Sequence, residues 1–103
     1  MIKVSVLYPN LEDLVFDKEY YLNKHVPLVS KLLGEALKNV QVDFGLTGGS
    51  HEESAIYVVM THLTFDSIES FEKIFPIHAE ELLSDIPRFT NSRPQLQISE
   101  VTI

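Results

Sequence analysis

The chain has 103 residues, 45% of them hydrophobic, which is typical of one globular domain spanning residues 1–103. Its formal net charge is −7 and its 8 lysines and arginines occur singly, which excludes a polybasic surface for nucleic acid or anionic membranes. The absence of cysteine excludes disulfides, and no run of about 18 apolar residues could span a membrane. Residues 1–8 are typical of a strand rather than a signal peptide, so we expect a cytoplasmic protein.

The first half of the chain predicts strand, helix and strand in that order. Residues 2–8 alternate with a period of two, which predicts a strand ended by Pro9 and Asn10. Apolar residues from 21 to 33 then follow helical spacing, with Asp17 as the N-cap and Gly34 as a point of weakening. Residues 40–46 alternate again and predict the second strand.

A polar turn at residues 47–54 leads to a third predicted strand at residues 55–65. One face of this strand carries Ile56, Val58, Met60 and His62, and the other carries Tyr57, Val59, Leu63 and Phe65. Two largely apolar faces predict a central strand that is covered on both sides.

The second half also contains a helix and a final strand. Asp66 followed by Glu69 resembles a capping box, and Pro76 is expected to interrupt the helix at mid-length. The segment Asp85-Ile86-Pro87 is expected to end it, and residues 95–99 predict the last strand.

The resulting order βαββαβ predicts a ferredoxin-like α+β fold with a four-stranded antiparallel sheet. Right-handed crossovers place both helices on one face of the sheet and leave the other face bare. Because the third strand is apolar on both sides, we expect the bare face to pack against a second copy, giving a homodimer.

His25 is the first candidate for chemistry, since it stands two residues before Pro27 within the predicted helix. Pro27 lacks an amide hydrogen, so we expect either a kink or two short helices with Pro27 in the first turn of the second. An imidazole titrates near neutrality and can act as a general base or acid. The structural alternative is that His25 binds a carbonyl freed by the irregularity.

Other candidates would share a pocket with His25. His78 lies on the same helical stripe as Phe71 and Phe75, next to Pro76, so two imidazoles could face an aromatic pocket between helices and sheet. The alternative for His78 is a buried imidazole that simply satisfies its hydrogen bonds. Tyr21 precedes His25 by one turn and could act on the same ligand.

Three further residues could contact a ligand there. Tyr8 and Tyr20 offer hydroxyl groups, and His62 could reach the pocket if its strand face meets the helices. No paired histidines at metal-ligand spacing and no glycine-rich dinucleotide motif occur, so we expect neither a metal nor a cofactor. A single histidine could still be an axial ligand of haem.

As a set, these motifs resemble the EthD family of the dimeric α+β barrel superfamily over nearly the whole chain. The residues that carry the resemblance are Phe16-Asp17, Tyr20-Tyr21, His25, Pro27-Leu28-Val29, Leu32-Leu33-Gly34, Gly45, Phe65-Asp66-Ser67, Phe71, His78-Ala79-Glu80-Glu81, Asp85-Ile86-Pro87, Thr90-Asn91 and Gln97-Ile98-Ser99-Glu100-Val101. The resemblance implies a dimer whose two sheets form a barrel with the helices outside. Superfamily relatives include polyketide cyclases, cofactor-free monooxygenases, lactone isomerases and haem-handling enzymes, so the fold does not select a reaction.

The sequence therefore predicts a homodimer in which each subunit binds a small apolar or aromatic organic molecule. The chemistry would be cofactor-free proton transfer linked to oxidative catabolism, with His25 as base or acid and Tyr21 or His78 assisting. Two alternatives stay open at this point: a non-catalytic ligand-binding module with the same pocket, and a haem-binding protein. The sequence does not decide whether the protein is an enzyme.

Overall fold

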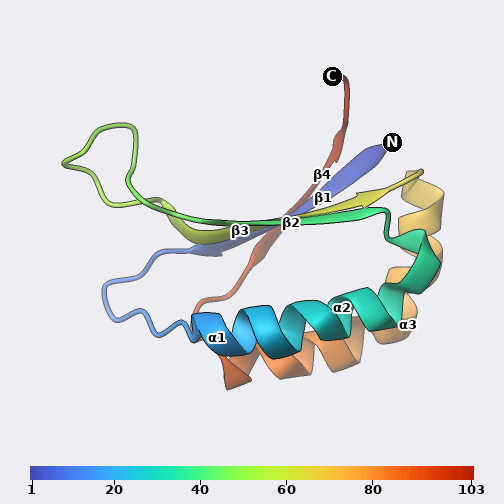
Figure 1. Ribbon diagram of the computed structural model, residues 1–103, viewed down its shortest axis with the longest axis horizontal. Coiled ribbons are helices and arrows are strands. Elements are labelled where there is room, and N and C mark those ends of the chain that lie inside the picture. The colour runs from blue at the N-terminus through green and yellow to red at the C-terminus, as the bar shows by residue number, and fades with distance from the viewer.

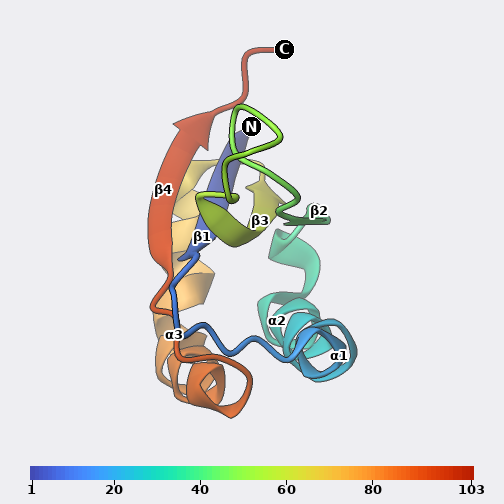
Figure 2. The same ribbon diagram turned by 90° about the vertical axis from the view of Figure 1, so that its left-hand side faces the viewer.

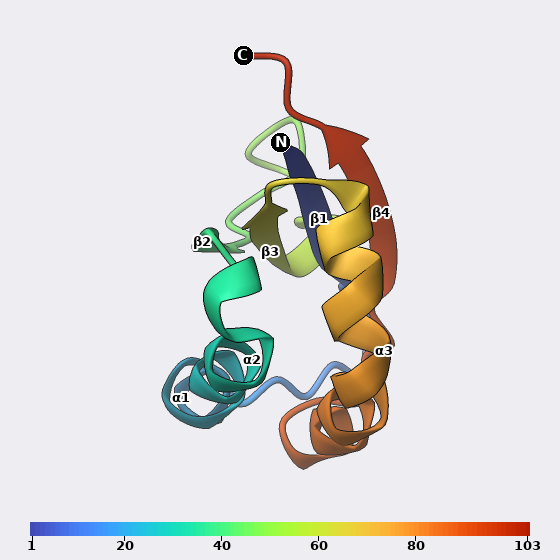
Figure 3. The ribbon, with the colours of Figure 1, turned by 90° about the vertical axis from the view of Figure 1, so that its right-hand side faces the viewer.

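A computed structural model describes all residues from 1 to 103. Strands β1 (Ile2–Pro9), β2 (Asn39–Phe44), β3 (Tyr57–Phe65) and β4 (Gln95–Glu100) form one antiparallel sheet in the order β2-β3-β1-β4 (Figure 1). The helices α1 (Lys18–Tyr20), α2 (Val26–Leu33) and α3 (Ile68–Asp85) cover the same face of this sheet (Figures 2 and 3). The ferredoxin-like α+β prediction is confirmed. None of the helices combines the length and the apolar composition needed to cross a membrane.

The first helical segment contains a wider turn at the position that Pro27 marks. Asp17 caps α1 by accepting a hydrogen bond from the Tyr20 amide. A π-helical turn at Tyr21–His25 follows, closed by the Val26 amide donating to the Tyr21 carbonyl. Pro27 then lies in the first turn of α2, as predicted, where its missing amide hydrogen costs little. The backbone stays right-handed helical throughout, and Gly34 ends α2 with a φ of +56°.

Helix α3 differs from its prediction at two points. Its N-cap is Ser67, whose hydroxyl accepts from the Ser70 amide, rather than Asp66. Pro76 does not interrupt the helix, which continues to Asp85 and then narrows into a 3-10 turn at Ile86–Arg88. Phe71 and Leu82 are buried on either side of the proline, and this packing holds the helix together across it.

The core lies between the helices and the sheet in two neighbouring clusters. One contains Val4, Leu33, Leu63, Phe65 and Phe71, and the other contains Tyr8, Tyr21, Val59 and Phe89. The buried face of β3 therefore carries Val59, Thr61, Leu63 and Phe65, and it meets the helices. The sequence left open which of the two sets meets the helices; in the structure it is the set with Val59, Leu63 and Phe65.

The opposite face of the sheet is open and mostly polar. The strand registers place Lys3, Ser5, Leu7, Asn39, Gln41, Asp43, Met60, His62, Thr64, Gln95, Gln97 and Ser99 on it. Leu7 and Met60 are the two apolar members of this set. On β3 itself, Val58 and Met60 share this face with His62 and Thr64, so the second predicted face is half apolar, and polar neighbours from β1, β2 and β4 surround it.

Candidate functional site

His25 lies in the interior between the helices and the sheet, where its side chain is 5% exposed. Its ring stacks on Tyr21 at a centroid distance of 5.5 Å and packs against Phe89 at 4.7 Å. Its Nδ1 atom is 2.9 Å from Oδ2 of Asp85, the last residue of α3. The π-helical turn and the end of α3 thus bring an imidazole and a carboxylate together.

Asp85 is itself held by two further side chains. Its Oδ1 atom accepts a hydrogen bond from the Tyr20 hydroxyl at 2.8 Å and lies 3.7 Å from Nε of Arg88. The sequence argument used Asp85 only as part of a helix end and missed its contact with His25. The sequence did contain one signal. Asp85 is an acidic residue in the last turn of a helix, where the helix dipole disfavours a negative charge unless a hydrogen-bond donor compensates it.

The charge states of this pair follow from burial and hydrogen bonding. Burial lowers the pKa of His25 and outweighs the opposite effect of Asp85. Burial raises the pKa of Asp85, but hydrogen bonds from His25 and Tyr20 outweigh it, so that this pKa lies below its ordinary value. At neutral pH, a neutral imidazole therefore donates its Nδ1 hydrogen to an ionised carboxylate, and Nε2 keeps its lone pair.

The Nε2 atom of His25 borders open space. It has no hydrogen-bond partner within the protein. Because every fully buried side-chain nitrogen and oxygen of the chain does have a partner, Nε2 is not fully enclosed by protein atoms. His25 lines two small cavities between the helices and the sheet, of about 60 and 40 Å³. We call the larger one the inner cavity; its lining residues are Val6, Tyr8, His25, Val29, Leu33, Leu63, Phe75, Leu82, Leu83, Ile86, Pro94 and Leu96.

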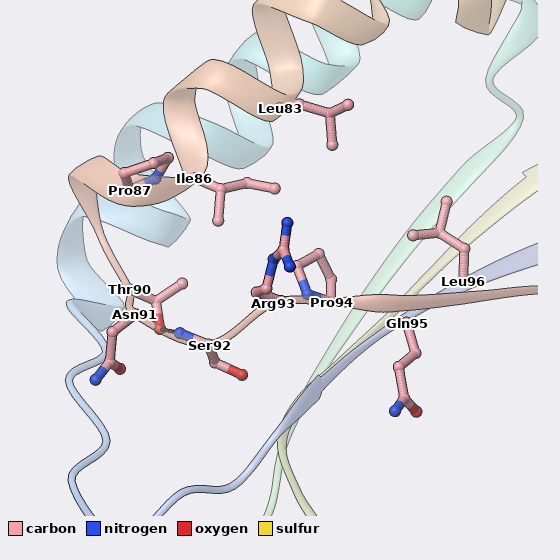
Figure 4. Close-up of a pocket in the computed structure, with 10 residues that line it drawn as sticks. All are labelled: Leu83, Ile86, Pro87, Thr90, Asn91, Ser92, Arg93, Pro94, Gln95 and Leu96. Carbon is pink, nitrogen blue, oxygen red and sulfur yellow. Dashed lines mark hydrogen bonds between the residues drawn. The ribbon is translucent and has the colours of Figure 1, made fainter.

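A larger outer pocket of about 800 Å³ adjoins the inner cavity (Figure 4). It lies between the end of α3 and the start of β4, and is lined by Leu83, Ile86, Pro87, Thr90, Asn91, Ser92, Arg93, Pro94, Gln95 and Leu96. Leu83, Ile86, Pro94 and Leu96 line both spaces. These four apolar residues therefore form the boundary between the two spaces, and a molecule in the outer pocket would have to pass them to reach His25.

The structure brings some of the predicted site residues together. His25, Tyr8 and Phe75 line the inner cavity, and Tyr21 lines the cavity of about 40 Å³ next to it. The Tyr21 hydroxyl is already bonded to the Thr61 hydroxyl at 2.5 Å. Burial raises the pKa of both Tyr8 and Tyr21, so both phenols are protonated. Tyr20 contributes through Asp85 rather than through either cavity.

Three predicted residues lie elsewhere. His78 is half-buried on α3 and lines neither cavity. Phe71 belongs to the first core cluster. His62 lies on the open face, where its Nδ1 atom is 2.8 Å from the Ser5 hydroxyl and Asp43 is 3.6 Å from its Nε2. The condition for His62 to reach the pocket, that its strand face meets the helices, is not fulfilled.

The residues around His25 do not fit a metal ion or haem. No three His, Cys, Asp or Glu side chains are grouped so that they could hold a metal ion. Nε2 of His25 is free to act as an axial ligand, but the inner cavity of about 60 Å³ is far below the roughly 300–1,000 Å³ of ordinary ligand pockets. Haem does not fit beside His25 with the helices packed in this way.

Comparisons with known proteins agree with this architecture. A family model described as the EthD domain matches residues 12–93, a segment that includes both His25 and Asp85. The crystal structure of an EthD-like protein from Ralstonia eutropha JMP134 is 39% identical, with a TM-score of 0.94, covering 99% of this chain and 92% of that one. An ethyl tert-butyl ether D (EthD) family protein from Bacillus halodurans C-125 is 25% identical, with a TM-score of 0.74 and 99% of both chains covered. Curated proteins gave no match. With this family match across most of its length, the chain belongs to the EthD family.

Proposed function

We propose that this EthD-family protein binds a small apolar or aromatic organic molecule in the outer pocket and the inner cavity, and that His25 acts on it as a cofactor-free general base or acid. One observation carries the proposal: Asp85 holds Nδ1 of His25 at 2.9 Å, while Nε2 has no hydrogen-bond partner and the His25 side chain lines an apolar cavity. A base whose other nitrogen is oriented by a carboxylate is the usual arrangement for proton transfer by histidine.

The chemistry needs only a proton to move. Nε2 would take a proton from an acidic C–H or O–H bond of the ligand, and Asp85 would stabilise the imidazolium that forms. The same proton would return to another atom of the ligand, which gives an isomerisation or assists a cyclisation. Because the lining is apolar, the Asp85–His25 interaction acts at a lower local dielectric than in water. Such a reaction suits the removal of reactive products of oxidative catabolism.

The volumes of the inner cavity and the outer pocket determine how a ligand could be placed in them. An inner cavity of about 60 Å³ admits only a small group, whereas the outer pocket of about 800 Å³ has room for the rest of the ligand. We therefore place the reacting group in the inner cavity and the remainder of the molecule between α3 and β4.

A non-catalytic binding module is the second candidate. The contacts of the His25 ring with Tyr21 and Phe89, together with its burial, are those that a purely structural histidine would make. In that case the pocket would bind the same class of ligand without turning it over.

Proton exchange separates the two candidates without knowledge of the natural substrate. The enolisable benzylic ketone 2-indanone is incubated with the protein in D₂O, and incorporation of deuterium beside the carbonyl is followed by NMR. We expect acceleration by the wild-type protein and a loss of about 10²–10⁴-fold in His25→Gln, the usual contribution of a general base. The melting temperature of His25→Gln is measured in parallel to establish that the variant is folded.

His78→Gln is the matched control, since His78 lines neither cavity and we expect its exchange rate to equal that of the wild type. A loss in this variant would restore the expectation that His78 assists. Equal rates for folded His25→Gln and wild type would reject the catalytic proposal and leave the binding module.

A further inference from the structure

Arg93 is the one charged residue among those that line the outer pocket. Its side chain starts in the loop before β4, and its guanidinium group points toward α3 (Figure 4). No carboxylate of the protein forms an ion pair with it, although the chain carries a net charge of −7. The other arginine, Arg88, lies beside Asp85. The outer pocket thus contains one uncompensated cation and no anion.

The loop that carries Arg93 is held firmly on its N-terminal side. The buried Ser92 donates its hydroxyl to the Pro9 carbonyl at 2.7 Å, and the Thr90 hydroxyl donates to the Val15 carbonyl at 2.6 Å. The Asn91 side chain donates to the Asp13 carbonyl and accepts from the Val15 amide, both at 2.9 Å. Because Pro94 follows with a restricted backbone, the guanidinium projects from a fixed base.

We infer that the ligand of the outer pocket is a carboxylic acid, whose carboxylate binds Arg93 while its apolar part reaches over Ile86 and Leu96 toward the inner cavity. The planar guanidinium matches a carboxylate with two parallel hydrogen bonds. Arg93 is solvent-exposed, so its guanidinium is free to bind an anion that enters the pocket.

Phosphate monoesters share this anion chemistry with carboxylates, but the charge balance favours the carboxylate. A single cation in a protein of net charge −7 suits a monoanion better than a phosphate group, which carries about −1.5 to −2 at neutral pH. The inference rests on the pocket of the proposed function, but it does not depend on proton transfer by His25.

Calorimetric titration with a matched pair of probes tests the inference. The acid 4-phenylbutyrate and its uncharged amide, 4-phenylbutanamide, have nearly the same shape. We expect the acid to bind the wild-type protein about tenfold or more tightly than the amide, because a hydrogen bond to a charged group is worth at least that factor. Arg93→Gln is expected to remove this preference by weakening the acid alone, and Arg93→Lys to keep part of it.

Lys73→Gln is the matched control, since it removes one positive charge at an exposed position of α3 outside the pocket and is expected to leave both affinities unchanged. The inference is overturned by equal binding of acid and amide, by an equal loss of both in Arg93→Gln, or by no binding of the acid below the millimolar range. Tighter binding of phenyl phosphate than of the acid would overturn the carboxylate assignment.

His25→Gln separates this inference from the catalytic proposal. If this variant keeps the preference for the acid and also keeps deuterium exchange, the catalytic proposal fails and the carboxylate site stands. If exchange depends on His25 but the acid and the amide bind equally, the catalytic proposal stands and the carboxylate site fails.

Discussion

At the scale of single residues, the burial of a neutral imidazole gives the protein a characteristic pH dependence. Burial places the pKa of His25 below its ordinary value of 6.5, so below about pH 6.5 the unfolded chain binds a proton that the folded chain does not. The free energy of unfolding therefore falls as the pH falls from about 6.5 toward the folded-state pKa, by at most about 1.4 kcal/mol per pH unit for one proton. The lowered pKa of Asp85 adds a further loss below its ordinary value of 3.8.

Urea unfolding at pH 7.5 and 5.5 measures this contribution. We expect the wild-type protein to lose more stability between these two values than His25→Gln does. His51→Gln, which changes an exposed histidine in the turn between β2 and β3, is expected to behave like the wild type. An unchanged pH dependence in His25→Gln would show that the imidazole is not buried in its neutral form.

At the scale of helices and strands, two exposed prolines have different surroundings. Pro27 follows the π-helical turn in the first turn of α2, whereas Pro76 lies inside the 18-residue helix α3. A proline in a helix interior removes one hydrogen bond and costs about 3 kcal/mol, part of which is offset by its restriction of the unfolded chain. We expect Pro76→Ala to raise the free energy of unfolding by about 1–3 kcal/mol, and Pro27→Ala to raise it by less.

Chemical denaturation of the two variants under one set of conditions checks this order. Each variant serves as the control for the other, because both replace an exposed helical proline with alanine. A larger gain at Pro27, or a loss of stability at Pro76, would contradict the account of the two helices.

The sequence predicted the order of elements because their periods of two and of 3.6 residues are local properties. It also led to His25, since an internal proline disturbs the helix locally. It could not predict the partner of His25, because Asp85 is 60 residues away and only the packing of α3 beside the π-helical turn brings them together. His78 was harder to place, since a helical stripe does not show which of its members border a cavity.

The faces of β3 show a second limit of the sequence. Both alternating sets contained large apolar residues, and the polar Thr61 belonged to the set that is buried. Thr61 is tolerated there because its hydroxyl bonds to Tyr21, a contact between residues 40 positions apart. Only the registers with β1 and β2, which join distant parts of the chain, reveal which face is open.

At the scale of the whole molecule, we propose a homodimer that uses the open face of the sheet. The argument from an apolar open face no longer holds, but Met60 lies on the central strand β3 of this face and is 36% exposed. The outer strands β2 and β4 also have unpaired edges. These features support association between copies of this chain.

Light scattering at micromolar concentration is expected to give twice the chain mass of 11.7 kDa. A lysine at position 60 would place a charge in the middle of the proposed interface, so we expect Met60→Lys to be monomeric. Leu22→Lys is the control, because Leu22 is 43% exposed on the π-helical turn, away from the sheet. A monomeric wild-type protein, or a dimer that survives Met60→Lys, would contradict the open-face dimer.

The central claim is that His25 presents an unprotonated Nε2 to an apolar cavity while Asp85 holds its Nδ1. Long-range ¹H–¹⁵N correlation spectra at pH 7, with His25 assigned by comparison with His25→Gln, test it most directly. The account predicts a neutral ring that carries its hydrogen on Nδ1. A ring protonated on Nε2, or on both nitrogens, would contradict it.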